Sequence, residues 1–390
     1  MRPPMRRRTF VTALVSGLAG CSGLGWSNQA SVQCSSNSSG ASKSSPVTGS
    51  WPRPHFDSSN TGTNPAAEGV TGCPEIRWSH SVGETTVGSA VVANGAIFTA
   101  GFPNTLRAFD LDTSEPLWSV PLDGTGYNPV VYDGVVYVGG GPKLHAVDIE
   151  TQSIRWSTMV GRSNGPAVIE DTLIAAGGDG VIRAISVDDG AVQWQYDAGA
   201  TEKHSFKAPP AVAGGTVFAG HENGNLYALD ATSGELRWRR DLGAQIEAAP
   251  AVVGDVVYAN ADQPFALDAE TGETQWQGPT KWRETLGAPA VADAVYVTSG
   301  TALESTKLRA LDPATGEEQW STNVGLPEAS PAVAAGSVYV GLGGTFYAFD
   351  ATDGSKQWSI DLPTDIEATP AVLSGLVVIT DIDGNMYGLG

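Results

Sequence analysis

Eight tryptophans recur at nearly regular spacing along this chain, and they constrain its fold more than any other feature. They are Trp78, Trp118, Trp156, Trp194, Trp238, Trp276, Trp320 and Trp358. The steps between them are 38, 40 or 44 residues. A repeat of about 40 residues built from short β runs is typical of a propeller with one four-stranded blade per repeat. The sequence therefore predicts an all-β, eight-bladed β-propeller with four-stranded blades.

One repeat shows how a blade is written. Short apolar runs at 250–253, 256–259, 265–268 and 274–276 are separated by turn residues, as expected for four strands. Asn94-Gly95 and Asp133-Gly134 stand at the first turn of other repeats and supply the positive φ that tight hairpins need. No stretch carries a long helical period, so we expect very little helix.

The two ends of the repeat region are complementary. Trp78 comes before the first complete unit, whereas the last unit stops at residues 386–390 without a tryptophan. We expect the strand at 75–78 to pair with the three C-terminal strands. That pairing would complete the eighth blade and remove the open edge of a linear array. The predicted propeller domain is 75–390.

The first 20 residues are predicted to be an export signal. Arg7 and Arg8 precede Thr-Phe-Val, which resembles a twin-arginine signal, and the apolar run at 11–19 is too short to span a bilayer. The segment 18–21 resembles a lipobox, so Cys21 is the candidate lipidation site. The alternative is a chance cysteine at the end of an ordinary signal. Lipidation predicts an exported protein held at the extracellular face of the membrane.

Residues 21–50 are rich in Ser, Gly and Asn and are expected to be a flexible linker, followed by a lead-in segment at 51–74. Cys34 and Cys73 lie 39 residues apart on the export side, where disulfides persist. A bridge between them would tie the linker to the propeller. The sequence alone does not decide whether it forms.

The charge is strongly acidic, with 42 Asp and Glu against 22 Lys and Arg and a net charge of −20. Such a surface lacks the basic footprint of a nucleic-acid-binding protein and favours a soluble monomer. Only seven residues are lysine. Acid-rich, lysine-poor surfaces resemble those of salt-loving microbes, which suggests a haloarchaeal origin. An ordinary acidic secreted protein is the alternative.

Within the repeats, Ala266–Trp276 and Ala310–Trp320 match the pattern A-x-D-x-x-T-G-x-x-x-W in full. This resembles the tryptophan-docking motif of the pyrroloquinoline-quinone (PQQ) repeat propellers. Weaker copies have Ser114 or Gln152 in place of the glycine. The resemblance implies that each tryptophan packs between neighbouring blades, which suits a large apolar ring with one hydrogen-bond donor. The tryptophans could instead be stacking platforms for a quinone or sugar, but their presence in every repeat favours packing.

The resemblance implies two kinds of function, which are quinone-dependent dehydrogenases and smaller non-catalytic scaffolds. Catalytic relatives are longer and carry adjacent cysteines beside the cofactor and a bound calcium. This chain has no adjacent cysteines, and its five histidines are scattered, so no metal cluster or Ser/His/Asp arrangement can be argued. We predict a scaffold for a protein partner or small ligand, without catalytic residues, cofactor or metal. The alternatives are a dehydrogenase for alcohols or sugars that binds PQQ and calcium, a quinone-binding protein and a cell-wall polysaccharide binder.

Three carboxylates occupy one repeat position. Glu247, Glu328 and Glu367 each stand three residues before the proline that opens a first strand, and Lys207 holds the same position in another repeat. Equivalent positions lie at equivalent heights in a ring, so we expect these charges near one mouth of the channel. An acidic mouth attracts a cation or a basic partner. The alternative is a set of solvated loop charges. Trp282, in the loop after another fourth strand, could cover a ligand there or simply cap the loop.

Overall fold

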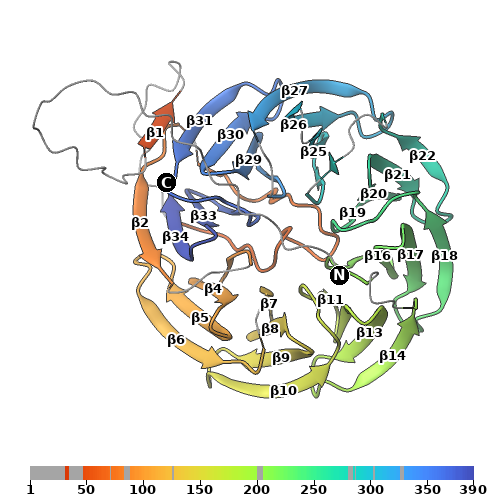
Figure 1. Cartoon of the computed structure of the whole chain (residues 1–390). Coiled ribbons are helices and arrows are strands. Elements are labelled where there is room, and N and C mark those ends of the chain that lie inside the picture. Colours follow the sequence, from red (N-terminus) through yellow and green to blue (C-terminus); the bar gives the residue numbers. More distant parts are fainter. Residues whose placement is uncertain are drawn as a thin grey trace, which may run out of the picture.

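The computed structural model describes residues 31–34, 47–70, 72–82, 88–124, 127–199, 205–279, 284–285, 287–301, 304–325 and 329–390. They form a ring of eight antiparallel blades, and the described residues include no helix (Figure 1). The described residues therefore contain no helix that could cross a membrane. The predicted eight-bladed, four-stranded propeller is confirmed.

The blades are numbered in chain order, with the strand nearest the axis first. Blade one comprises β3 (Val91–Ala93), β4 (Ala96–Gly101), β5 (Thr105–Asp110) and β6 (Pro116–Pro121), and blade two comprises β7 (Tyr127–Tyr132), β8 (Val135–Gly140), β9 (Lys143–Asp148) and β10 (Ser153–Met159). Blade three comprises β11 (Ala167–Ile169), β12 (Thr172–Ala176), β13 (Val181–Ser186) and β14 (Val192–Asp197), and blade four comprises β15 (Ala211–Ala213), β16 (Thr216–Gly220), β17 (Asn225–Asp230) and β18 (Leu236–Asp241).

The remaining blades follow the same order with small variations. Blade five comprises β19 (Ala251–Val253), β20 (Val256–Asn260), β21 (Pro264–Asp268) and β22 (Thr274–Gln277). Blade six comprises β24 (Ala290–Val291), β25 (Val295–Thr301), β26 (Glu304–Leu311) and β27 (Glu318–Gly325), and the short β23 (Glu284–Thr285) also pairs with β25. Blade seven comprises β28 (Ala332–Ala334), β29 (Ser337–Leu342), β30 (Thr345–Asp350) and β31 (Lys356–Asp361), and blade eight comprises β32 (Ala371–Leu373), β33 (Leu376–Thr380), β34 (Asn385–Leu389) and β2 (Ile76–Ser81).

The hydrophobic core is divided among the interfaces between blades. Val136 and Val138 of blade two, for example, share a buried cluster with Phe98 of blade one. Second strands such as β4 are buried on both faces because they are sandwiched between neighbouring blades, whereas outer strands such as β14 alternate between half-buried and exposed residues. This is why the sequence shows continuous apolar runs for the inner strands and a lone tryptophan in the outer ones.

The ring closes through the two ends of the repeat region, as predicted. The N-terminal strand β2 pairs antiparallel with β34, with Trp78 opposite Gly388. Beyond the strand ends, Glu75 and Gly390 exchange two backbone hydrogen bonds of 3.0 Å. Figure 1 shows β2 beside β34 at the C-terminus. Blade eight is thus completed by residues from opposite ends of the propeller, which closes the ring.

The repeated tryptophans dock onto the following blade. In five of the eight, the indole Nε1 donates to a backbone carbonyl in the next blade's turn between its third and fourth strands. The observed pairs are Trp156 to Val187 (2.9 Å), Trp194 to Ala231 (3.0 Å), Trp238 to Ala269 (2.9 Å), Trp276 to Pro313 (2.8 Å) and Trp320 to Ala351 (3.0 Å). Buried Trp358 has no Nε1 acceptor among the described residues. The reason is topological, since blade eight replaces that turn by the two chain ends at Glu75 and Gly390.

The lead-in segment occupies the central channel. Its residues 48–64 hydrogen-bond in turn to the innermost strand of every blade, or to the residue just after it. The contacts join Thr48 to Ser374, Trp51 to Val92, Pro52 to Val131, Ser58 to Val168 and Val212, Ser59 to Val252, Thr61 to Val291, Gly62 to Val333 and Asn64 to Val372. Figure 1 shows this segment in orange, running through the middle of the ring. We call residues 48–64 the channel plug. It satisfies the inner strand edges that would otherwise face an open channel.

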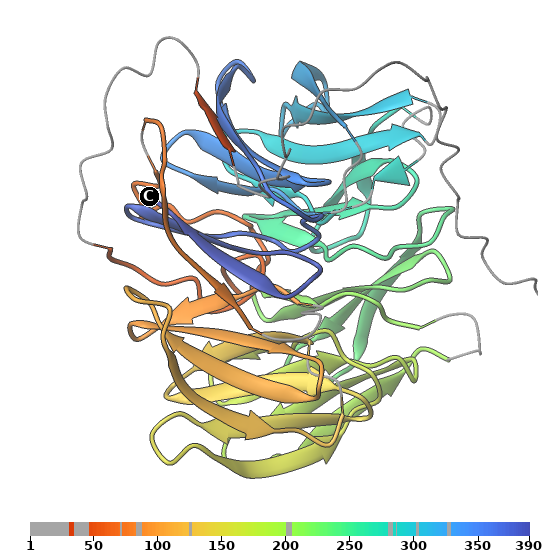
Figure 2. The same ribbon diagram turned by 60° about the vertical axis from the view of Figure 1, so that its left-hand side comes forward.

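An additional strand lies outside blade seven. Residues of β1 (Ser31–Cys34), within the segment expected to be a flexible linker, pair antiparallel with β31 at the outer edge of the blade. Cys34 forms a disulfide with Cys73, which lies just ahead of β2. Figure 2 shows β1, in red, from a second side. The bridge that the sequence left open is therefore present. It joins β1, at the outer edge of blade seven, to the segment that leads into β2 of blade eight.

Candidate functional site

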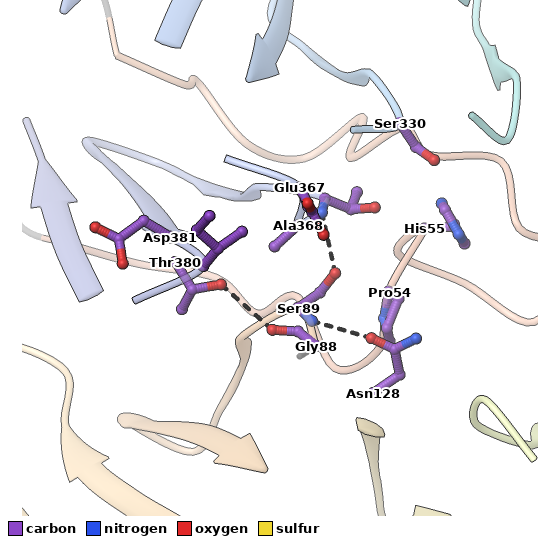
Figure 3. A pocket seen from close by; sticks show the side chains of 12 residues that line it. Pro54, His55, Gly88, Ser89, Asn128, Ser330, Glu367, Ala368, Thr380 and Asp381 are labelled. Carbon is purple, nitrogen blue, oxygen red and sulfur yellow. Dashed lines mark hydrogen bonds between the residues drawn. The ribbon is translucent and has the colours of Figure 1, made fainter. Parts of the chain in front are cut away.

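A polar cavity of about 210 Å³ lies at one mouth of the channel (Figure 3). It opens on the face where the loop leaving each outer strand enters the next innermost strand, which we call the loop face. Pro54 and His55 of the channel plug form part of its lining. The remaining lining residues are Gly88, Ser89, Asn128, Ser330, Glu367, Ala368, Thr369, Thr380, Asp381 and Ile382. The lining therefore combines the plug with loops of blades seven, eight, one and two.

The polarity of this cavity comes from one column of the repeat. The column is the second residue before the regularly paired part of the innermost strand, which in β7 begins at Val130, after a register shift. In blades seven, eight, one and two it reads Ser330, Thr369, Ser89 and Asn128. In blades three to six it reads Gly165, Pro209, Ala249 and Ala288. The repeat thus builds a polar half and an apolar half around one mouth, and the cavity lies over the polar half.

Hydrogen bonds link the polar half from blade to blade. The backbone N of Thr369 donates to Ser89 Oγ at 3.0 Å, and the backbone N of Ser89 donates to Asn128 Oδ1 at 3.0 Å (dashed in Figure 3). Asn128 Nδ2 in turn donates to the Asn164 carbonyl at 3.3 Å. Four blades are therefore connected by side chains that the regular repeat lacks. Their groups are held in place before any ligand arrives.

Asn128 is confined by two glycines. Its φ is +40°, in the left-handed region that asparagine tolerates better than most residues. A Cβ on Gly88 would lie 2.7 Å from its backbone N, and one on Gly165 would lie 2.9 Å from its carbonyl O. Larger residues at these positions would displace Asn128. The close approach explains why glycine stands there instead of the alanine or serine of other repeats.

Beneath the mouth, the channel plug buries two basic side chains. Arg53 is 3% exposed, and its Nη2 donates to Asn60 Oδ1 at 3.1 Å. Its Nε and Nη1 have no acceptor within the described ranges. Desolvation lowers the pKa of Arg53 to about 10, although the Asp57 carboxylate opposes the shift. Burial, helped by the Arg53 charge, lowers the pKa of His55 to about 3, so the imidazole lining the cavity is neutral at physiological pH.

The two carboxylates of the cavity, Asp381 and Glu367, differ in exposure to solvent. Asp381 is 2% exposed and accepts hydrogen bonds from the backbone of Asp383, from Asn385 and from the Tyr387 hydroxyl. Burial and this carboxylate raise the pKa of Tyr387. Asp381 is therefore engaged in its hairpin turn. Glu367 is exposed and lines the cavity.

These residues do not fit a PQQ and calcium centre. The quinone is a flat polycarboxylate, whereas the described lining offers the carboxylates of Glu367 and Asp381 and no cationic side chain. The axis beneath is filled by the channel plug. The described residues also contain no group of three or more His, Cys, Asp or Glu that could hold a metal. The arrangement is suited instead to a cationic or hydroxyl-rich group.

The other predicted site residues are distributed as follows. Glu247 is exposed on the loop face but does not line this cavity. Lys207 lies away from the glutamates, in a second cavity where its Nζ is 3.6 Å from Glu222 Oε1. Lys207 and the described glutamates thus lie on the same face, as expected, but Lys207 lines a different cavity from Glu367. Predictions for Arg7, Arg8, Cys21, Trp282 and Glu328 fall outside the described residues.

Sequence reasoning missed Ser89, Asn128 and His55. The signal for the first two was present in the aligned repeat column, which changes from Gly, Pro and Ala to Ser, Thr and Asn. No comparable signal exists for His55. It lies in the lead-in segment, outside the repeat, and only the path of that segment through the channel brings it to the cavity.

Comparison with known proteins places this architecture in a family. The family model described as "Outer membrane protein assembly factor BamB" matches residues 103–205, 199–330 and 304–390. The matches cover most of the propeller, and the chain belongs to this family of PQQ-like repeat propellers. No curated protein sequence matches the chain.

Several solved structures share the fold at low sequence identity. BamB from Moraxella catarrhalis is 19% identical with a TM-score of 0.69, and the match covers 81% of this chain and 99% of that one. Quinohemoprotein alcohol dehydrogenase from Comamonas testosteroni is 14% identical with a TM-score of 0.73, covering 87% and 80%. A europium-containing methanol dehydrogenase is 12% identical with a TM-score of 0.71, covering 88% and 98%. At these identities the structures show a common fold and leave the activity open.

Proposed function

We propose that this protein is a non-catalytic binding scaffold whose loop face recruits a protein partner at a membrane surface. The observation that carries the proposal is the prearranged polar mouth, closed below by the channel plug and bordered by Glu367. Such a site offers acceptors and hydroxyls to a partner's basic or polar side chain. Membership of the BamB-like family supports a protein-binding role.

The position of the partner follows from the N-terminal prediction. Export through Arg7 and Arg8 and lipidation of Cys21 would hold the propeller close to the membrane, with the segment up to β1 as the tether. Replacing Cys21 with alanine should then release the protein into the soluble fraction of cells or into the medium. If the Cys21→Ala protein stays at the membrane, the lipid-anchor prediction is wrong. The proposal that the loop face binds a partner does not depend on this result and is tested separately.

The loop face can be tested with a charge-matched pair of variants. In the full-length protein, Glu247, Glu328 and Glu367 would all be changed to glutamine. The control changes three exposed glutamates at one equivalent turn position on the opposite face, namely Glu235, Glu273 and Glu317. Both variants remove three negative charges, so they differ in the location of the change and not in net charge.

A photo-reactive residue at Ala368 reports on the loop face, and one at Thr271 reports on the opposite face. We expect a discrete protein cross-link from position 368, reduced at least fivefold in the loop-face triple variant and unchanged in the control. Equal cross-linking from positions 271 and 368, or equal loss in both triple variants, would refute the loop face as the recruiting surface.

The dehydrogenase neighbours define the alternative function. We propose that no cofactor is needed, since the described cavity would repel a polycarboxylate quinone. Purified protein incubated with PQQ and calcium should show no dye reduction with alcohols or sugars. A stoichiometric chromophore with dye reduction would favour the enzyme over the scaffold.

A further inference from the structure

A second cavity on the loop face has an electrostatic character unlike the rest of the protein. It has a volume of about 430 Å³ and lies between blades two, three and four. Tyr127, Arg162, Ser205 and Lys207 line it, together with Asn128, which also lines the first cavity. Two cationic side chains, Arg162 and Lys207, thus line one cavity of a chain whose net charge is −20. Nothing in the proposed scaffold function uses this cavity.

Arg162 is held in a fixed position without being neutralised. Its Nη2 donates to the Tyr127 hydroxyl at 2.6 Å, and its Cζ lies 5.2 Å from the centre of that ring. The carboxylate of Asp179, next to the cavity residue Gly178, is taken by Arg183 through contacts of 3.1 and 2.7 Å. Among the described residues Arg162 forms no ion pair. Its guanidinium is exposed, oriented and not paired with an acid there.

Lys207 is only weakly neutralised. Its Nζ lies 3.6 Å from Glu222 Oε1, beyond hydrogen-bonding distance, and its side chain is 51% exposed. Glu222 is bound elsewhere, because its Oε2 accepts from the Ser205 backbone N and hydroxyl at 2.8 Å each. The ammonium therefore keeps its donors for a group entering from solvent.

Among the described residues, several other arginines of the propeller, unlike Arg162, are neutralised by a carboxylate. Arg155, Arg183 and Arg237 each contact a carboxylate at 2.5 to 2.7 Å. Arginine is suited to carboxylates because its planar fork can donate two parallel hydrogen bonds, and a nearby lysine adds a compact positive charge. We propose that the cavity between blades two, three and four binds the carboxylate group of a small organic acid, with Arg162 and Lys207 as its ligands. This site is separate from the acidic mouth and needs no protein partner.

The test is calorimetric titration of the purified full-length protein with succinate, and with its uncharged diamide succinamide as the ligand control. Arg162→Gln and Lys207→Gln are compared with Arg237→Gln, which removes an exposed arginine already paired with Asp230. Circular dichroism and thermal unfolding of every variant establish that it is folded. A peptide carrying one glutamate, blocked at both ends, serves as a third ligand.

We expect saturable succinate binding, no succinamide binding, and affinity lowered at least tenfold in Arg162→Gln and several-fold in Lys207→Gln. Arg237→Gln should bind as the native protein does. Binding of the blocked glutamate peptide in place of succinate would keep the carboxylate site and identify its source as a protein side chain. Absence of binding by both acids, or equal binding by folded Arg162→Gln and the native protein, would overturn the proposal. Neither result would bear on the loop-face cross-link.

Discussion

At the scale of single residues, the turn between the third and fourth strands, which we call the docking turn, has no room for a Cβ atom at its glycine. Gly272 has a φ of +70°, and a Cβ there would lie 2.7 Å from the Trp238 ring. Asp268 fixes the same turn by accepting from the backbone and hydroxyl of Thr271 at 2.8 and 2.9 Å. Those hydrogen bonds lower the pKa of Asp268. The motif therefore specifies the turn and the place of the neighbouring blade's tryptophan together.

This geometry predicts opposite effects for two substitutions. Gly272→Ala should lower the free energy of unfolding by about 1 to 3 kcal/mol, because the methyl group meets the indole and the positive φ is costly. Ser114 occupies the equivalent turn of blade one with a φ of +59°. Ser114→Gly should therefore raise stability by about 0.5 to 1 kcal/mol. Urea unfolding followed by tryptophan fluorescence checks both, and equal destabilisation by the two would contradict the explanation.

His55 gives a prediction about pH. The pKa of His55 is about 3 in the folded protein and about 6.5 in the unfolded chain. As the pH falls below 6.5, His55 is therefore protonated in the unfolded chain while it stays neutral in the folded protein. His55 therefore makes the folded state lose stability between pH 6.5 and 3, by about 3 kcal/mol at pH 4. His55 has a φ of +62°, which asparagine also tolerates. His55→Asn therefore keeps the backbone conformation and removes the loss of stability at low pH. Urea unfolding at pH 8 and pH 4 should show a smaller difference in His55→Asn, and an unchanged difference would contradict the assigned cause.

At the scale of elements, the channel plug is the feature with the widest contacts. Asn60 is fully buried; its Nδ2 donates to the Pro250 carbonyl at 3.1 Å, and its Oδ1 accepts from Arg53. Trp51 and Phe56 of this segment pack in the hydrophobic core, and the segment also forms hydrogen bonds to the inner strand of every blade. A buried donor or acceptor that loses its partner costs more than an exposed one. The buried polar side chain of Asn60 therefore adds to the backbone hydrogen bonds that hold the plug.

Asn60→Ala should lower the free energy of unfolding by about 2 to 4 kcal/mol, since it removes these bonds and leaves Arg53 without that acceptor. Asn94 offers a matched control. It has a φ of +53°, close to the +55° of Asn60, but lies exposed in a hairpin turn. Asn94→Ala should cost about 1 kcal/mol through the backbone alone. Equal losses in urea unfolding for the two variants would show that the buried hydrogen bonds contribute little.

The strands themselves could be predicted well from the sequence. Each blade repeats the same apolar runs and turns, so eight copies support one another, and the missing tryptophan after residue 386 indicated the closure through β2. The plug and β1 could not be predicted, because neither belongs to the repeat. Their partners, such as Val372 for Asn64 and Trp358 for Cys34, lie more than 300 residues away.

At the scale of the whole molecule, charge should control stability. The net charge of −20 makes the compact state repel itself, and salt shortens the range of that repulsion. Raising KCl from 0.1 to 2 M should therefore raise the melting temperature by at least several degrees. Sucrose at equal osmolality is the control for effects unrelated to screening. A melting temperature that responds to sucrose and not to KCl would argue against adaptation to high salt.

The loop face combines two cavities of opposite character around Asn128. Glu367 lines one and Arg162 and Lys207 line the other, so a single ring surface presents an acidic and a basic site side by side. The sequence predicted that charges at one repeat position would share this face. It did not separate Lys207 from the glutamates, because the repeat gives the height of a residue and not the cavity to which its side chain contributes.

The repeated sequence by itself determined the number of blades, the order of strands and the way the ring closes. These follow from short-range patterns, because every blade except the eighth has its four strands in one contiguous stretch and buries its faces against the next copy. The tertiary structure decided what occupies the channel and where the cavities lie. Both depend on non-repeating residues, namely the plug with Arg53 and His55 and the irregular positions Ser89 and Asn128, whose neighbours come from distant parts of the chain. The tryptophan repeat thus accounts for the ring, and the departures from it account for the candidate sites.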